Sequence, residues 1–321
     1  MRSPLVLRAP SRHALDDFFA YFGNRMNCNS FFVRAIVALF AIGALCVSTK
    51  KADAQIRASE RGSVSQTIDG LRLTVEYGRP RARGRENIYG GLEPFNSAWT
   101  PGADSATTLE ITRPIKLLGR TVPKGKYSLW LVLREQGPWT FVLDPRAELF
   151  HTAHPDSTRA QVRALIAPQT VPRTEALTWT FSTIGVNTTT LEMRWGTKGI
   201  SVPIEITPTY PLTVNATEVV PLVGVYELKP VSQQSNMAGE LTLSLHSEKL
   251  MGTLKQPNGT ILEVQLLPSG PDEFVYTSSR NGEILSLIQG YTFHFQRSGG
   301  VVTGFEFTNA TGLEARGVRR K

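Results

Sequence analysis

Residues 63–112 read SVSQTIDGLRLTVEYGRPRARGRENIYGGLEPFNSAWTPGADSATTLEIT. From Leu71 to Tyr77, apolar residues alternate with polar ones, and a period of two is typical of a strand with one buried face. Asp69-Gly70 separates this run from the apolar and polar residues of 64–68. Asp-Gly is a preferred two-residue hairpin turn, so the stretch predicts an antiparallel hairpin and an all-β fold.

The same alternation recurs after this stretch, around Trp179, Met193 and Val202. Residues 127–133 are apolar on both faces, which predicts a central strand that is covered on each side. The spacing in Val162–Ile166 fits a helix or a strand, and we favour the strand. Together these patterns predict an antiparallel β-sandwich over residues 56–208.

The second half of the chain begins after Pro208-Thr209-Tyr210-Pro211, whose two prolines predict a linker. Short strand signals follow at regular spacing, separated by turn sequences such as Asn258-Gly259. This rhythm predicts a smaller β-barrel-like or sandwich domain over residues 216–315, followed by a basic tail at 316–321.

The first 54 residues have the features of a leader. An apolar run from Ala35 to Val47 follows Arg34, and the small residues of Ala52-Asp53-Ala54 come soon after it. This order predicts a secretory signal peptide and a periplasmic or secreted protein. A membrane anchor is the alternative, although thirteen residues are fewer than the roughly 20 that a spanning helix needs. Met26 is an alternative start, and the position of any cleavage stays open.

Composition excludes several classes of site and partner. Both cysteines, Cys28 and Cys46, lie in the leader, so the remaining chain has no thiol for disulfides, metal binding or nucleophilic attack. The net charge is +8, with 35 basic and 27 acidic residues. Residues 1–54 hold seven of the basic and three of the acidic residues, which leaves 28 against 24 and a charge of +4. A nucleic-acid partner, which requires a broad basic face, is not supported.

Several motifs of the first domain resemble one family. SVSQTIDG, VEYGRPRARGR, IYGGLEPFNSAWTPGADSATT and VPKGKYSLW, followed by WTF and LEMRW, are similar to the domain-of-unknown-function family 2911 of exported bacterial proteins. The resemblance covers residues from about 63 to 206. It implies an exported β-sandwich and no established activity.

The C-terminal part has a looser resemblance. LVGVYEL, GELTLSLHSEKLMGTL and FTNATGLEARGVRR are similar to a small β-rich accessory module of exported hydrolases. This resemblance implies a barrel-like module without fixed chemistry.

The segment after the first hairpin is rich in arginine. Arg79, Arg81, Arg83 and Arg85 alternate, so in an extended chain their guanidinium groups would share one face and could bind a carboxylate, phosphate or sulfate. The alternative is structural. Arginines in a long loop can bind backbone carbonyls or pair with nearby acids, here Glu86, Glu93 and Asp104.

Trp99 and Asp104 follow these arginines closely. An indole near polar groups suits stacking against a sugar or closing over an anion, whereas the alternative for Trp99 is a place in the core. The predicted binding surface therefore consists of the four arginines with Trp99 and Asp104.

His151, His154 and Asp156 form a candidate metal site. Two histidines three residues apart share a face on a helix, but Pro155 disfavours helical backbone at His154. We therefore predict a solvent-exposed loop, and neither a metal nor another cofactor.

No nucleophile signature such as G-x-S-x-G occurs after the leader. Nothing in the sequence pairs two of the carboxylates, for example Asp104, Asp144 and Glu148, at one site. The sequence favours a non-catalytic binding protein of the cell envelope whose ligand is a small anion, a glycan or a protein partner. The alternatives are a hydrolase with a carboxylate pair, and a scaffold that pairs through exposed strand edges.

Overall fold

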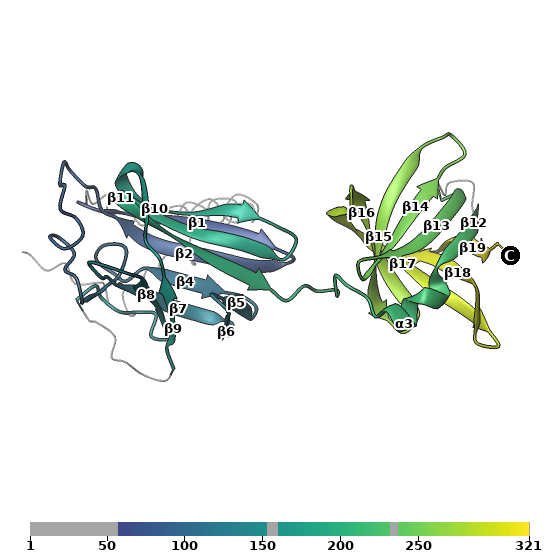
Figure 1. The fold of residues 1–321 in the computed structure, drawn as a ribbon, viewed down its shortest axis with the longest axis horizontal. Helices are drawn as coiled ribbons and strands as arrows, with labels where there is room; N and C mark the ends of the chain where they lie inside the picture. Colours follow the sequence, from purple (N-terminus) through teal and green to yellow (C-terminus); the bar gives the residue numbers. More distant parts are fainter. Residues whose placement is uncertain (1–56, 153–159, 232–236, 321) are drawn as a thin grey trace, which may run out of the picture. The chain divides into compact units, whose positions relative to one another are not determined.

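The computed structural model describes residues 57–152, 160–231 and 237–320 (Figure 1). The predicted leader with both cysteines lies outside these residues, as do His154 and Asp156. Within them the chain is all-β, as predicted, with nineteen strands and two short helical turns. Among these same residues, no helix combines the length and apolar character that a membrane crossing requires.

The first half forms two antiparallel sheets. One has seven strands in the order β1-β2-β4-β7-β8-β9, with β3 paired to β7, and the other has four in the order β10-β11-β5-β6. The seven strands are β1 (Glu60–Ile68), β2 (Leu71–Arg79), β3 (Ala98–Trp99), β4 (Thr108–Ile111), β7 (Gly125–Val132), β8 (Trp139–Asp144) and β9 (Val162–Ile166). The four are β5 (Ile115–Leu117), β6 (Arg120–Val122), β10 (Gln169–Ile184) and β11 (Thr188–Ile206).

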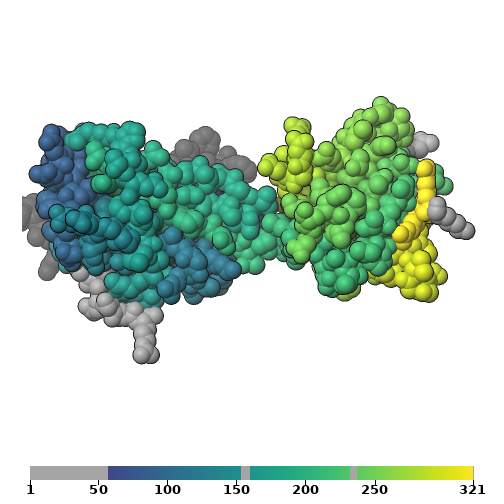
Figure 2. Space-filling model, in the orientation of Figure 1, coloured from purple at the N-terminus to yellow at the C-terminus, as the bar shows by residue number. Residues whose placement is uncertain are grey.

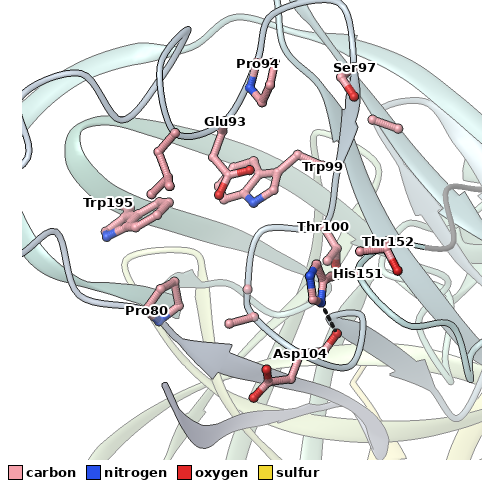
Figure 3. Close-up of a pocket in the computed structure, with 14 residues that line it drawn as sticks. Pro80, Glu93, Pro94, Ser97, Trp99, Thr100, Asp104, His151, Thr152 and Trp195 are labelled. Atoms are coloured by element: carbon pink, nitrogen blue, oxygen red, sulfur yellow. Dashed lines mark hydrogen bonds between the residues drawn. The ribbon is translucent and has the colours of Figure 1, made fainter. Parts of the chain in front are cut away.

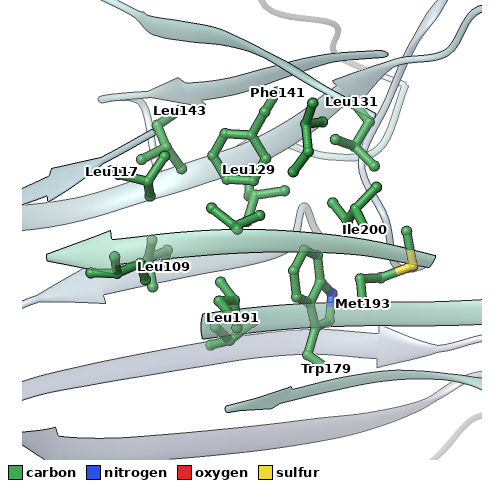
Figure 4. Packing of buried hydrophobic residues seen from close by; sticks show 14 of the residues in the cluster. Leu109, Leu117, Leu129, Leu131, Phe141, Leu143, Trp179, Leu191, Met193 and Ile200 are labelled. Carbon is green, nitrogen blue, oxygen red and sulfur yellow. The ribbon is translucent and has the colours of Figure 1, made fainter. Parts of the chain in front are cut away.

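Both sheets bury their apolar residues in one common core, which makes this half a β-sandwich (Figure 4). Leu129 from β7, Leu117 from β5 and Trp179 from β10 belong to the same buried cluster. The alternation from Leu71 to Tyr77 has the predicted effect, because the apolar side chains are buried and Arg72 between them is exposed.

The predictions for the turn at 69–70 and for the strands around 127–133 and 162–166 agree with the structure, whereas residues 316–319, predicted as part of a basic tail, belong to the last strand, Gly312–Arg319. Asp69 and Gly70 have φ angles of 46° and 72°, as a type I′ hairpin turn between β1 and β2 requires. Residues 162–166 form a strand, β9. β7 lies between β4 and β8, and both of its faces are buried: Leu129 and Leu131 face the main core, and Trp130 faces a small second cluster with Val142.

The chain changes sheets at Pro123-Lys124-Gly125. β6 ends just before this turn in the four-stranded sheet, and β7 begins in the seven-stranded sheet. The turn therefore does not form a hairpin, and instead carries the chain across the edge of the sandwich.

The second half forms a closed antiparallel barrel in which each strand pairs with the next and β19 pairs back to β12. Its strands are β12 (Gly224–Pro230), β13 (Gly239–His246), β14 (Lys249–Lys255), β15 (Ile261–Gly270), β16 (Glu273–Arg280), β17 (Glu283–Ser298), β18 (Val301–Asn309) and β19 (Gly312–Arg319). On the face shown in Figure 2, the barrel atoms, coloured green to yellow, form a continuous surface.

Aromatic side chains fill the barrel. Phe293 and Phe307 lie 4.8 Å apart between ring centroids, and Phe305 and Tyr226 lie 5.3 Å apart. Because all four side chains are buried, the barrel has a packed core of its own. Residues 207–215 contain no strand or helix and connect β11 to the two helical turns, α3 (Ala216–Val219) and η1 (Val220–Leu222), which precede β12.

Candidate functional site

The arginine segment is not extended. Arg83 and Gly84 have φ angles of 51° and 75°, which turn the chain directly after the bridge between Arg81 and Ala176. The premise that four arginines of an extended chain share one face is therefore wrong. Arg85 bends back within the turn, where its Nη1 donates to the carbonyl oxygen of Arg81 at 3.3 Å.

Two of the arginines use their guanidinium groups on distant backbone. Arg79 Nε donates to the carbonyl oxygen of Leu177 in β10 at 3.4 Å, and Arg83 Nη2 donates to that of Ala58 at 3.2 Å. The backbone N–H of Arg83 is also held, by the carboxylate of Glu175 at 2.7 Å. These contacts follow the structural alternative, in which arginines bind backbone carbonyls.

Trp99 and Asp104 lie elsewhere, at a pocket of about 470 Å³ at one end of the sandwich (Figure 3). We call it the Trp99 pocket. Its wall comes from four parts of the chain: the residue after β2, the loop of residues 92–104, the segment after β8, and β11. The lining residues are Pro80, Leu92, Glu93, Pro94, Ser97, Ala98, Trp99, Thr100, Gly102, Ala103, Asp104, His151, Thr152 and Trp195. No lysine or arginine occurs in this set of described residues.

The wall that Thr100 and Gly102 contribute is a turn held by buried hydrogen bonds. Thr100 Oγ1 donates to the carbonyl oxygen of Leu129 at 3.0 Å and accepts from the N–H of Thr107 at 2.8 Å. Thr107 Oγ1 donates to the carbonyl oxygen of Pro101 at 2.9 Å. Because these side chains satisfy buried backbone groups, the turn at residues 100–104, which belongs to no strand, can lie inside the sandwich end.

Gly78 allows this turn to approach β2 closely. A Cβ atom at position 78 would lie 2.8 Å from the backbone nitrogen of Ala103 and would overlap its carbonyl oxygen. Gly102, on the same turn, packs against the Gly78 backbone. Glycine at position 78 is therefore required for the observed shape of the pocket wall.

Trp99 and Trp195 line the pocket, and Tyr89 and Trp139 extend this aromatic cluster without lining the pocket. Trp99 and Trp195 stack with centroids 5.8 Å apart and an interplanar angle of 21°, and Tyr89 meets both edge-on. Tyr89 also contacts Trp139 at 5.3 Å, and its hydroxyl donates to the carbonyl oxygen of Trp195 at 3.1 Å. Trp99 therefore belongs to the core, where it is 7% exposed, and it also lines the pocket.

Glu93 supplies a carboxyl group beside these rings (Figure 3). Its backbone is fixed on both sides, because its N–H donates to the carbonyl oxygen of Ile88 and its own carbonyl accepts from Gly90, each at 2.8 Å. No described residue makes a hydrogen bond or an ion pair with the carboxyl group. Burial without a partner raises the pKa of Glu93 to about 7.

We expect this shift to make the protein less stable as the pH rises from 5 to 8. The Glu93 carboxyl ionises near pH 4.5 in an unfolded chain but near 7 in the folded one. Between these values the folded state holds the proton that the unfolded state has released. Unfolding therefore becomes easier by at most about 1.4 kcal/mol per pH unit, and the loss is complete above pH 7. Urea denaturation at pH 5, 6, 7 and 8 measures it.

Glu93→Gln should remove this pH dependence, because glutamine does not titrate. Glu86→Gln is the matched control, since Glu86 is an exposed acid of the same loop that does not line the pocket. Equal slopes in Glu93→Gln and the unsubstituted protein would place the responsible group elsewhere.

Asp104 and His151 form the outer side of the pocket. His151 Nδ1 lies 3.0 Å from the carbonyl oxygen of Asp104, so Nδ1 carries the proton, and the backbone N–H of His151 donates to the same oxygen at 2.8 Å. Figure 3 places Asp104 across the pocket from Glu93. Among the described residues, no group of three or more acidic, histidine or cysteine side chains could hold a metal ion.

Asp144 orders the segment that carries His151. Its buried carboxylate accepts two bonds at 2.9 Å from the guanidinium of Arg146 and one at 2.6 Å from Gln161 Nε2. The hydrogen bonds from the Arg146 guanidinium contribute most to lowering the pKa of Asp144, which is about 2. The group is thus ionised and fully engaged, and it anchors the start and the end of the loop after β8.

Sequence reasoning missed Glu93 as a pocket residue and considered it only as a partner for the arginines. The apolar neighbours Leu92 and Pro94 are the only signal in the sequence. They do not decide whether the Glu93 side chain faces the protein interior or the solvent, because an acid between apolar residues in a loop can do either. The contacts from Glu93 to Ile88 and Gly90 that decide its direction could not be read from the sequence.

The comparisons with known proteins concern the first half of the chain. No curated protein matches it. A family model described as "Protein of unknown function (DUF2911)" matches residues 59–204, from the start of β1 almost to the end of β11. This range includes both sheets and all residues that line the Trp99 pocket. The chain therefore carries a β-sandwich domain that belongs to the DUF2911 family.

Proposed function

We propose that the protein is an exported, non-catalytic binding protein and that it binds a glycan in the Trp99 pocket. The observation that carries this proposal is the combination of a nearly buried indole and an unpartnered carboxyl group in one cavity. Sugars present apolar C–H faces to aromatic rings and hydroxyl donors to carboxylates, so both groups have a role in their recognition.

The polar groups of the pocket support a ligand with many hydroxyls. Trp99 Nε1 has no hydrogen-bond acceptor among the described residues, and the Glu93 carboxyl has no donor. Ser97 and Thr152 add hydroxyl groups to the lining. A sugar can both accept from the indole N–H and donate to the carboxyl group, which would satisfy polar atoms that are otherwise left without partners.

A small anion is less well supported at this pocket. The described lining has two acidic residues, Glu93 and Asp104, and neither lysine nor arginine. The guanidinium groups of Arg79 and Arg83 are bound to backbone carbonyls. An anion would thus meet like charge in the pocket.

The test is a calorimetric and thermal-shift screen of mono- and disaccharides on the purified protein. Trp99→Phe keeps an aromatic ring in the core but removes the indole N–H, and we expect it to weaken binding about tenfold. Glu93→Gln should weaken it by a similar factor, and Glu86→Gln should not change it. Absence of binding by every sugar, or sugar binding that is unaffected in both Trp99→Phe and Glu93→Gln, would refute the proposal.

A hydrolase is the second candidate, because Glu93 and Asp104 line one pocket and the raised pKa of Glu93 suits a general acid. Chromogenic glycosides test this candidate. Release of the chromophore by the unsubstituted protein and its loss in both Glu93→Gln and Asp104→Asn would favour hydrolysis. Binding without turnover favours the non-catalytic proposal.

The proposed location outside the cytoplasm rests on the sequence of the first 54 residues. Cell fractionation tests it, since the protein should be found in the periplasm or the medium. Accumulation in the cytosol would contradict export.

A further inference from the structure

The Glu93 carboxyl group lies in a part of the pocket that offers it no positive charge. The described residues that line the pocket include three titratable side chains, Glu93, Asp104 and His151. Tyr89 forms a backbone bridge with Glu93, and its hydroxyl donates to the carbonyl oxygen of Trp195. The hydrogen bond to Asp104 leaves His151 Nδ1 protonated without requiring a charge on the ring. With both acids ionised, the cavity is therefore negative.

The aromatic rings beside this carboxyl group add to the preference for a cation. Trp99 and Trp195 line the pocket, and ring faces attract an ammonium group by their negative quadrupole. The backbone hydrogen bonds of Glu93 to Ile88 and Gly90 keep it next to these rings without a partner. A partly buried carboxyl group in this position is stabilised most by a ligand that brings both a donor and a positive charge.

We infer that the ligand of the Trp99 pocket carries a protonated amino group that pairs with Glu93, so that among glycans the pocket selects amino sugars. This inference rests on the proposed function for the sugar part of the ligand. The charge selection rests separately on the lining residues, and it also predicts binding of simple organic cations.

The affinity for such a ligand should increase as the pH rises, because the Glu93 carboxyl must lose its proton to pair with a cation. Below about pH 7 the Glu93 carboxyl is protonated, and the cation must displace that proton. The affinity for a ligand of fixed positive charge should therefore rise between pH 6 and 8, by up to tenfold per unit below the pKa, and level off above it. Glu93→Gln is the variant that separates the contribution of Glu93 from that of the other charged or titratable lining residues, Asp104 and His151.

The experiment is calorimetry on the purified protein with matched probes: 6-amino-6-deoxyglucose, glucosamine, N-acetylglucosamine, glucose and choline. At pH 7.5 we expect the two amino sugars to bind at least tenfold more tightly than the neutral sugars. Glu93→Gln should reduce this preference to within about twofold and flatten the pH profile. Glu86→Gln should retain both the preference and the profile.

The outcomes separate the two proposals. Equal or tighter binding of the neutral sugars, or an amino-sugar preference that survives in Glu93→Gln, would overturn the charge selection while leaving glycan binding intact. Binding of choline alone, sensitive to Glu93→Gln, would support the charge selection and overturn the glycan proposal. No binding by any probe would overturn both.

Discussion

Replacement of Trp179 by alanine is expected to lower the free energy of unfolding of the sandwich by about 4 kcal/mol, because a large buried side chain leaves a cavity. Trp179 is 1% exposed and lies in the core that the two sheets share. Its Nε1 also donates to the carbonyl oxygen of Pro101 at 3.1 Å, in the turn that forms the wall of the Trp99 pocket. Urea denaturation followed by tryptophan fluorescence and circular dichroism measures the loss.

Trp179→Phe separates the cavity from the hydrogen bond. Phenylalanine keeps most of the ring volume but cannot donate to Pro101, so a loss of about 1–2 kcal/mol is expected. Phe150→Ala is the exposed control, since this aromatic side chain is 51% exposed and its removal should change stability by less than about 0.5 kcal/mol. A loss in Trp179→Ala no larger than that in the control would contradict the observed packing.

Gly78→Ala is expected to lower stability by about 2–3 kcal/mol and to weaken ligand binding in the same protein. The added methyl group would meet backbone atoms of Ala103, which cannot rotate away as a side chain can. Either β2 or the turn at 100–104 must shift, and this turn lines the pocket. Denaturation and calorimetry on one sample measure the two effects together.

Gly84→Ala is the matched control for this substitution. Gly84 has a φ angle of 75° and open space where its Cβ would lie, so alanine there should cost only about 1–2 kcal/mol of backbone strain. It should leave ligand binding unchanged, because Gly84 does not line the pocket. Equal effects of the two substitutions on binding would show that Ala103 tolerates the extra methyl group.

Much of the fold could be predicted because its signals are local. Asp69-Gly70 specifies a hairpin turn by its own backbone preferences. Residues 127–133 are apolar on both faces of the strand, which indicates that both faces are covered. The choice between a barrel and a sandwich for the second half depends on the pairing of β12 with β19. These strands are far apart in the sequence, and the period of two is the same in both architectures, so no local pattern distinguishes them.

The candidate site could be predicted only in part, for a similar reason. Trp99 and Asp104 line the pocket, but Arg79 and Arg83 are directed to backbone carbonyls elsewhere. The alternation of the arginines suggested an extended chain, whereas positive φ angles at Arg83 and Gly84 turn it. Such angles are expected for glycine and uncommon for arginine, and here the hydrogen bond from the Arg83 N–H to Glu175, 92 residues away, holds the turn.

The pairing that closes the barrel also determines how it would respond to mechanical force. β12 and β19 are antiparallel, with Tyr226 opposite Arg319 and Pro230 opposite Ala315, so the chain enters and leaves the barrel at the same end of one strand pair. Tension between these two points would peel the strands apart one hydrogen-bonded pair after another, instead of shearing all pairs at once. The barrel has no free strand edge, yet the β12–β19 pair that closes it can be separated by tension, one hydrogen-bonded pair at a time, starting from one end.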